Sequence, residues 1–265
     1  MRTIQELASR ERTPADRYGS ANLNLMSLIP PASRNFLELG CSTGKLGKLL
    51  REKFSVERLV GVEADLESAR LADPHYDDVL VTELDQLELP YAEAVFDTLI
   101  AGDILEHLAD PEAVLRYCRQ FMVAHGSAMV CLPNVRNLSL LEALARGTWR
   151  ATDLGLLDRT HRHFFSRRTA MEMFERAGFV CQADGMVYVS ATWLNDCLPP
   201  ETRWSAEWVT RYDRAAEAAR RGDVATVTEA LKQWLASGLL ESIPAAEHSE
   251  FLSVQLMFRL TPRLL

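Results

Sequence analysis

The hydrophobic pattern is clearest in the first third of the chain, where short apolar runs alternate with an amphipathic stretch. A short apolar run, formed by Phe36, Leu37 and Leu39, stops at a loop of small residues, GCSTG, at 40–44. Apolar residues then recur at helical spacing over 46–54, and a second apolar run, 59–62, ends in Glu63. This succession predicts a strand, a tight loop, a helix and a second strand, which is a βαβ unit.

The same alternation continues through most of the chain. Further strands are expected at 78–82, 95–101, 127–132 and 180–193. Helices are expected at 21–28 with Ser20 as the cap, at 66–71, from the Asp110-Pro111 pair to Gly126, from Ser166 to Gly178, and at 205–221 and 223–237. The segment 251–260 alternates with a period of two and predicts a half-buried last strand. The pattern as a whole predicts an α/β fold with a doubly wound sheet and a helical insertion before the last strand.

The loop at 40–44 limits the kinds of ligand that this unit can bind. A dinucleotide loop needs Gly-x-Gly-x-x-Gly, but Ser42 and Lys45 stand at the second and third glycine positions. A Walker A loop needs four residues between its glycines, and Gly40 and Gly44 are one residue too close. A tight turn below a helix N-terminus suits the carboxylate of an amino-acid ligand. Glu63 lies 19 positions after Gly44 (63 − 44), near the roughly 20-residue spacing of an acid that binds a ribose hydroxyl.

A ligand with a ribose and a carboxylate but no phosphate is S-adenosylmethionine. The alternative is an ordinary βαβ unit whose glycines only make the turn. The sequences LELGCSTG and GVEAD resemble the first motif and the acidic end of the second strand in class I S-adenosylmethionine-dependent methyltransferases. This resemblance implies a Rossmann-like seven-stranded sheet in the order 3-2-1-4-5-7-6, with an antiparallel seventh strand, and S-adenosylmethionine as the cofactor. Ser42 departs from the family, in which the middle residue of the loop is usually glycine.

The cofactor site is expected at the loop and at the ends of the neighbouring strands. Gly40, Ser42 and Gly44 are expected to cradle the methionine end. The stretch ELDQLELPY resembles the region where the family has an acid that reaches the adenine amino group, which implies this role for Glu83 and a backbone contact for Leu84. The family usually has Asp at that position. The complete predicted set is Glu38, Gly40, Cys41, Ser42, Gly44, Glu63, Ala64, Glu83, Leu84, Gly102 and Asp103.

Methyl transfer is an in-line displacement, so the enzyme must align the nucleophile, and an alcohol acceptor also needs a base. ILEHL after Asp103 resembles the D-x-L-E-H motif of the family. Imidazole is the natural base near neutral pH, so the predicted catalytic residues are His107, His161 and Asp103. The alternative is structural: His107 would hold the start of a helix, and His161 would pair with Asp158. Together with Glu106 these side chains could also bind a divalent cation, but they lack a metal-site spacing, so no metal site is predicted.

The segment 134–165 is dense in polar and aromatic residues and is expected to be poor core material. It resembles a segment of bacterial methyltransferases found among enzymes that build surface polysaccharides and other sugar conjugates. The matching motifs are Pro133-Asn134-Val135, Gly147-Thr148-Trp149, Leu157-Asp158-Arg159-Thr160-His161 and Phe164-Phe165. The segment is therefore expected to form an acceptor lid within a single methyltransferase domain spanning 1–265. An N-terminal helical cap at 1–34 and a helical insertion at 200–245 complete the expected organisation.

The resemblance favours O-methylation of a sugar hydroxyl in polysaccharide or glycoconjugate biosynthesis. Aromatic faces stack on sugar rings and arginines pair with phosphate or uronate groups; the candidates are Trp149, Trp193, Arg136, Arg150, Arg159 and Arg162. The bland alternative is that Trp149 packs the lid and that the arginines are solvated. Two other functions remain open: O-methylation of a quinone precursor or small phenol, and a non-catalytic cofactor-binding subunit of a biosynthetic complex.

Composition narrows the partners. The chain has 265 residues, of which 48% are hydrophobic and 25% charged, as in globular proteins. Its net charge of −8 argues against a general nucleic-acid surface. The five cysteines are scattered and form no Cys-x-x-Cys pair, which fits buried thiols in a reducing compartment. With no transmembrane segment or signal sequence expected, the predicted location is the cytoplasm, and the oligomeric state, a homodimer included, is left open.

Overall fold

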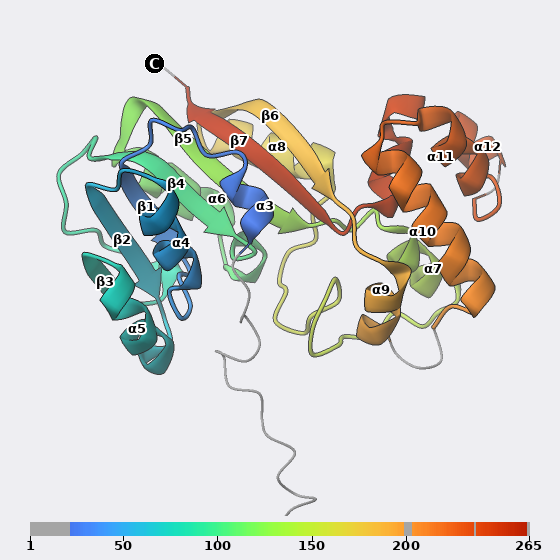
Figure 1. The fold of residues 1–265 in the computed structure, drawn as a ribbon, viewed down its shortest axis with the longest axis horizontal. Coiled ribbons are helices and arrows are strands. Elements are labelled where there is room, and N and C mark those ends of the chain that lie inside the picture. The colour runs from blue at the N-terminus through green and yellow to red at the C-terminus, as the bar shows by residue number, and fades with distance from the viewer. Residues whose placement is uncertain (1–21, 199–202, 236, 264–265) are drawn as a thin grey trace, which may run out of the picture. The chain divides into compact units, whose positions relative to one another are not determined.

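A computed structural model describes residues 22–198, 203–235 and 237–263. Its centre is a seven-stranded sheet in the order β3-β2-β1-β4-β5-β7-β6 (Figure 1). The strands are β1 (Asn35–Leu39), β2 (Arg58–Glu63), β3 (Asp78–Val81), β4 (Phe96–Gly102), β5 (Met122–Pro133), β6 (Phe179–Val187) and β7 (Gln255–Pro262). This order confirms the expected Rossmann-like fold.

Helices connect the strands and form the insertion before β7. They are α3 (Leu23–Met26), α4 (Lys45–Lys53), α5 (Leu66–Ala72), α6 (Pro111–Arg119), α7 (Leu138–Ala145), α8 (Arg167–Arg176), α9 (Ala191–Cys197), α10 (Ala206–Arg220), α11 (Val224–Leu231) and α12 (Ser237–Glu241). Short 3-10 helices are η1 (Asp73–His75), η2 (Leu84–Gln86), η3 (Leu105–His107) and η5 (Ala245–Leu252). Within the described ranges, none of these helices combines the length and apolar composition of a membrane span.

Several helices begin where the sequence places a capping side chain. The Asp110 carboxylate accepts a hydrogen bond from the backbone N–H of Ala113 at 2.9 Å, with Pro111 as the first helical residue. The prediction that α6 extends to Gly126 is wrong. The helix stops at Arg119 because the carbonyl of Phe121 already accepts the backbone N–H groups of 95 and 96, which draws the chain into the sheet.

The remaining boundary errors fall around the insertion and at the N-terminus. The sixth strand ends at Val187, so Trp193 lies on helix α9 and not on a strand. The last strand begins at Gln255, because Phe251 and its neighbours to 252 belong to η5. Apolar alternation continues across that junction, so the pattern could not reveal the change of backbone. The first described helix begins at Leu23, and the Ser20 cap lies outside the described residues.

The residues group into two compact units, and the expected single domain stays a prediction. The first unit runs up to residue 130 and includes 174–182 and the C-terminal part from 259; the second comprises 131–173 and 183–258. In the first unit, β1 pairs in parallel with β2 and β4, and β2 pairs in parallel with β3. Both faces of β1 are buried, as expected for a parallel sheet covered by helices.

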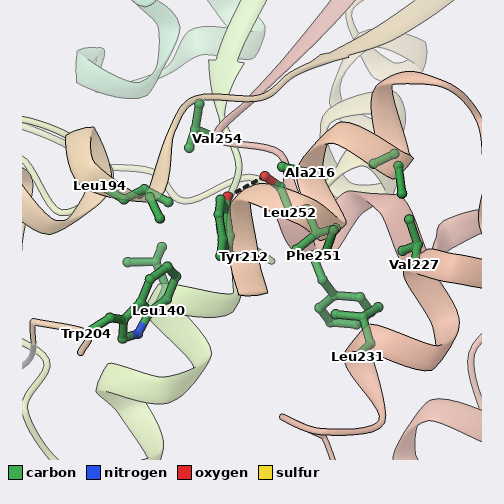
Figure 2. Close-up of a cluster of buried hydrophobic side chains, with 14 of the residues drawn as sticks. Leu140, Leu194, Trp204, Tyr212, Ala216, Val227, Leu231, Phe251, Leu252 and Val254 are labelled. Atoms are coloured by element: carbon green, nitrogen blue, oxygen red, sulfur yellow. Dashed lines mark hydrogen bonds between the residues drawn. The ribbon is translucent and has the colours of Figure 1, made fainter. Parts of the chain in front are cut away.

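The second unit has its own core, built mainly by the helices of the insertion (Figure 2). Tyr212 of α10 is completely buried there, and its hydroxyl donates a hydrogen bond to the carbonyl of Leu252 at 2.5 Å. The ring packs against Trp204, with the ring centroids 5.0 Å apart. The Asn134 side chain, also fully buried, donates to the carbonyl of Glu250 at 2.7 Å. These bonds satisfy polar groups that would otherwise destabilise an apolar core.

Candidate functional site

The first unit places the ends of four strands along one edge. Leu39 at the end of β1 is in register with Val62 on one side and with Ala101 on the other, and Glu63 is in register with Val81. Because the four strands are parallel, their carboxyl ends and the loops that follow meet at this edge. Ligands of open α/β sheets bind outside the carboxyl ends of the strands. The residues predicted to bind the cofactor therefore lie at or near this edge, where ligands of such sheets bind.

The loop after β1 has an unusual backbone. Gly40, Ser42 and Gly44 have φ angles of 70°, 46° and 76°, in the left-handed region. A β-carbon at Gly40 would lie 2.8 Å from the δ-carbon of Ile104, so this position also excludes a side chain sterically. The positive φ at Ser42 is a strained state for a non-glycine residue, and it marks the position where the family more often has glycine.

Glu63, the last residue of β2, is hydrogen-bonded to this loop. One carboxylate oxygen accepts the backbone N–H of Ser42 at 2.8 Å, and the other accepts the N–H of Asp65 at 2.9 Å. The acid therefore fixes the loop to the end of β2. Each carboxylate oxygen can accept a second hydrogen bond, so the predicted contact with ribose hydroxyls remains chemically available.

Two hydroxyl groups of the loop indicate that it is shaped for a ligand. The side-chain oxygens of Ser42 and Thr43 are buried and have no hydrogen-bond partner among the described residues. Buried hydroxyls normally find partners. The orphaned hydroxyls, the absence of side chains at the two glycines and the acid at the end of β2 together fit the methionine and ribose parts of S-adenosylmethionine.

Glu38 of β1 and Cys41 of the loop are both buried. The Tyr76 hydroxyl donates a hydrogen bond to the carboxylate of Glu38 at 2.6 Å. Burial raises the pKa of Glu38 to about 7, although the Tyr76 hydrogen bond acts in the opposite direction and the charge of Glu63 adds to the rise. Burial raises the pKa of the Cys41 thiol as well, which favours the neutral thiol and makes it a poor nucleophile.

The predicted adenine contacts occupy the end of β3. Glu83 is exposed and precedes η2, and Leu84 begins this short helix and is buried. Ala64, which follows the acid of β2, is exposed. The exposure of Glu83 leaves its carboxylate accessible to a ligand, and its role stays a prediction.

Gly102 is the last residue of β4 and Asp103 follows it, whereas the sequence predicted that the strand would end one residue earlier, at Ala101. Asp103 has a φ of 53°, and one of its carboxylate oxygens accepts a hydrogen bond from the side-chain amide of Asn22 at 3.1 Å. A β-carbon at Gly102 would lie 2.9 Å from a methyl carbon of Leu25. Sequence reasoning missed Asn22, because nothing in its local pattern indicates a contact with a residue 81 positions away.

His107 lies in η3 with its side chain half-buried, directly after the buried Glu106. Its Nε2 atom is 3.9 Å from a carboxylate oxygen of Glu106. The pair follows Asp103 at the end of β4, which is the position expected for groups that take part in the chemistry. The roles of His107 and Asp103 as catalytic residues remain predictions.

The expectation that 134–165 is poor core material is only partly right. Asn134, Asp158 and Phe165 are buried, and the backbone of 134 forms a bridge with that of 165. The Asp158 carboxylate accepts hydrogen bonds from the backbone N–H and the hydroxyl of Thr160, at 2.9 and 2.6 Å. These polar groups are tolerated in the interior because each of them has partners.

Aromatic side chains of the same segment stay at the surface. Trp149 is 38% exposed and Phe164 is 46% exposed, and their rings meet edge to face with centroids 5.8 Å apart. The ring of His161, which is half-buried, lies 6.5 Å from that of Phe164. Trp193 of α9 is also exposed, at 46%. The second unit thus presents an aromatic pair with a histidine beside it.

The arginines proposed for anionic groups differ in their surroundings. Arg136 is engaged within the unit: its guanidinium lies 2.9 Å from Glu247 and 2.6 Å from Glu250 and stacks over the ring of Phe251. It therefore has little capacity for a phosphate. Arg159 pairs with Asp153 in an exposed ion pair. The side chains of Arg150 and Arg162 are exposed.

Comparison with known proteins places the chain in a family. The family model described as a methyltransferase domain matches residues 10–183. A probable S-adenosylmethionine-dependent methyltransferase of Mycobacterium tuberculosis is 28% identical over 102 residues, which are 38% of this chain and 36% of that protein. The chain thus spans about a third of the length of these mycobacterial relatives. A ubiquinone biosynthesis O-methyltransferase of Neisseria meningitidis is 24% identical over 165 residues, or 58% of this chain and 68% of that protein.

Solved structures share the fold at low sequence identity. The methyltransferase bound to the Trm112 methyltransferase activator of Haloferax volcanii gives a TM-score of 0.59 at 14% identity and covers 98% of this chain and 96% of its own. A S-adenosylmethionine-dependent methyltransferase of Archaeoglobus fulgidus gives 0.57 at 16% identity, with 93% and 96% covered. Given the sheet order, the glycine loop, the acid of β2 and the matching domain model, this chain belongs to the methyltransferase domain family, whose methyl donor is S-adenosylmethionine.

Proposed function

We propose that this protein transfers a methyl group from S-adenosylmethionine to a hydroxyl of a sugar, in a polysaccharide or glycoconjugate. The choice of a sugar rests on the resemblance of the segment 134–165 to methyltransferases that build surface polysaccharides and other sugar conjugates. The exposed pair of Trp149 and Phe164 is the surface that would contact the acceptor. Large exposed aromatic side chains tend to mark binding surfaces, and aromatic faces pack well against the apolar faces of sugar rings. The exposed residues Arg150 and Arg162 lie nearby in sequence, and guanidinium groups suit phosphate or uronate groups on such an acceptor.

The donor, when bound, supplies a methyl group already activated by the sulfonium. The residues of the protein must then align the acceptor oxygen and remove its proton. His107 at the end of β4 and His161 beside Phe164 are the two candidates for the base, and Asp103 is a candidate for orienting the acceptor. Replacing the true base by alanine should reduce turnover by at least ~100-fold with little change in cofactor affinity. If both alanine variants keep full rate, neither histidine is the base.

A second candidate acceptor is a small phenol or quinone precursor. It is favoured by the 24% identity to the ubiquinone biosynthesis O-methyltransferase of Neisseria meningitidis. The same aromatic pair can stack on a phenol ring, so Trp149 does not separate the two acceptor classes. The two acceptor classes have to be distinguished by testing sugars and phenols directly as acceptors.

The test is a transfer assay with methyl-labelled S-adenosylmethionine against panels of nucleotide sugars, oligosaccharides and phenols. Labelling of a sugar supports the proposal, whereas labelling of phenols or quinone precursors alone contradicts it. With the labelled acceptor, Trp149→Ala should raise KM by about fivefold, as expected from the loss of an aromatic stacking contact of about 1 kcal/mol. Leu239→Ala is the matched control, because Leu239 is an exposed apolar side chain of α12 in the same unit.

Binding without transfer has a different meaning. If the protein binds S-adenosylhomocysteine but labels no member of any panel, the result favours the third function, a non-catalytic cofactor-binding subunit of a biosynthetic complex. Cofactor binding is therefore measured by calorimetry on the same preparation before the acceptor panels are compared.

A further inference from the structure

Two glycines of the first unit leave space for one aromatic ring. A β-carbon at Gly47 of α4 would lie 2.4 Å from the ring of Tyr76, and one at Gly61 of β2 would lie 3.0 Å from it. Neither glycine has a positive φ, so the backbone conformation does not require glycine at these positions. Glycine is a poor residue for the interior of a helix. At Gly61 the added β-carbon would also lie 2.6 Å from the Cys41 sulfur. The Tyr76 ring therefore explains the glycine of the helix, and Tyr76 together with Cys41 explains the glycine of the strand.

The space at Gly47 and Gly61, called the slot below, places the Tyr76 hydroxyl against the carboxylate of Glu38. Tyr76 and Glu38 are 7% and 6% exposed, and the hydroxyl of the first donates to the carboxylate of the second at 2.6 Å. Glu38 precedes the cofactor loop by two positions, and Tyr76 comes from the segment between η1 and β3. The three titratable groups that face Glu38 are Tyr76, Glu63 of β2 and Cys41 of the loop. Glu63 is an acid and Cys41 is a neutral thiol, so the Tyr76 phenol is the group among them that favours the carboxylate form of Glu38.

We propose that Tyr76 is a positioning residue, which favours the carboxylate form of Glu38 and holds it in place next to the loop so that its charge can hold the cationic methionine end of the cofactor. S-adenosylmethionine carries positive charge on its sulfonium and its α-ammonium group. A carboxylate in a buried site attracts such charge far more strongly than one in water. This inference rests on the methyl donor of the proposed function and adds to it a residue outside the loop.

Cofactor binding should be coupled to the release of a proton from Glu38. Burial raises the pKa of Glu38 to about 7, and the Tyr76 hydrogen bond holds this pKa below the value that burial alone would give. A cation bound next to Glu38 would lower its pKa. Binding near pH 7 therefore releases a proton from the fraction of Glu38 that is protonated, and affinity falls as pH drops through this region. Without the Tyr76 hydroxyl the protonated fraction is larger, and the fall begins at higher pH.

The experiment is calorimetric titration of the full chain with S-adenosylhomocysteine from pH 6 to 8.5, in phosphate and in Tris, whose different ionisation enthalpies report the protons released. Tyr76→Phe keeps the ring in the slot and removes only the hydroxyl. We expect this variant to bind about five- to tenfold more weakly than the wild type near pH 6.5 and about equally at pH 8.5, since each tenfold change in an ionisation constant shifts its pH dependence by about one unit. It should also release more protons near pH 7.

Two further variants separate positioning from packing. Tyr91→Phe removes a hydroxyl that donates to the carboxylate of Asp78 at 2.7 Å in the same unit, and it should leave the pH profile unchanged. In Glu38→Gln, which cannot titrate at this position, adding Tyr76→Phe should have no further effect on the profile. Equal weakening of Tyr76→Phe at every pH, or a wild-type profile, overturns the proposal. If the wild type itself fails to bind at any pH, the methyl donor and the proposed function fail instead.

Discussion

The side-chain amide of Asn22 lies 3.1 Å from a carboxylate oxygen of Asp103, which joins the first described helix to the end of β4. The same Asn22 caps α3, because its side-chain oxygen accepts the backbone N–H of Leu25 at 3.3 Å. Asp103 has a positive φ, a conformation that costs free energy in a non-glycine residue and clusters at functional sites. One asparagine thus both starts a helix and holds a strained acid.

Asn22→Ala should therefore destabilise the protein and loosen Asp103. The loss of the cap alone should lower the free energy of unfolding by about 0.5–2 kcal/mol. The measurement is chemical denaturation of the wild type and the variant. Asn24→Ala is the control, because Asn24 lies in the same helix with an exposed side chain. Equal destabilisation by both replacements would show that the cap and the Asp103 contact contribute nothing specific.

Glu63→Ala should weaken cofactor binding by about 2–4 kcal/mol, the scale of losing a charge-assisted pair of hydrogen bonds. Part of this loss comes from the loop, since the same carboxylate accepts the backbone N–H groups of Ser42 and Asp65. Calorimetry with S-adenosylhomocysteine measures it. Glu57→Gln removes the charge of an exposed acid that pairs with Arg34 and should leave the affinity as it is. Unchanged affinity in Glu63→Ala would remove the acid from the cofactor site.

The stability of the ligand-free protein should depend on Glu38 in a predictable direction. Its pKa in the folded state is raised from 4.5 to about 7, so between these values the folded protein binds more protons than the unfolded chain. Unfolding free energy then falls as pH rises from about 4.5 to 7, by at most about 3 kcal/mol for this group. Denaturation curves of the wild type and Glu38→Gln at pH 5 and pH 7 test this. The difference between the two proteins should change over that interval, and a constant difference would contradict the burial of a titrating acid.

Tyr212→Phe should destabilise the core of the second unit without leaving a large cavity (Figure 2). The variant leaves the carbonyl of Leu252 without the hydroxyl that donates to it at 2.5 Å, and a buried group that loses its partner costs about 1–3 kcal/mol. Thermal unfolding measures the change. Thr210→Val is the control: it removes an exposed hydroxyl on the same helix, which donates to the carbonyl of Ala206. A Tyr212→Phe variant as stable as this control would mean that the hydrogen bond is not maintained in solution.

Local patterns were sufficient for the first βαβ unit. The loop 40–44, the helix that follows it and the acid of β2 lie within 24 positions (63 − 40 + 1). Their backbone conformations depend mostly on their own residues: glycine at two of the three loop positions with a positive φ, small residues before a helix N-terminus, and apolar runs in a parallel strand. The same holds for α6, where Asp110 and Pro111 mark the first turn. The strand order, in contrast, came from the family resemblance.

Local patterns failed where two backbone conformations bury the same side chains. Phe251 and Leu252 are buried in a 3-10 helix, although their alternation with the following residues predicts a strand. The alternating pattern shows only which side chains are buried, and both a strand and a 3-10 helix can bury them. The hydrogen bonds that decide between the two conformations come from elsewhere in the fold. Asn134 is a related case, because a buried amide is tolerated only through its bonds to Glu250 and Ser253.

By itself the sequence determined the loop that is predicted to cradle the donor, the acid at the end of β2 and the positions of the candidate groups at the strand ends. Only the tertiary structure decided what supports them. Tyr76 reaches Glu38 across 38 positions, through space that Gly47 and Gly61 leave empty, and Asn22 reaches Asp103 across 81. No local period encodes such contacts. They arise because parallel strands bring their ends to one edge of the sheet. There a side chain from a distant segment can form the hydrogen bond that a polar group lacks among its own sequence neighbours.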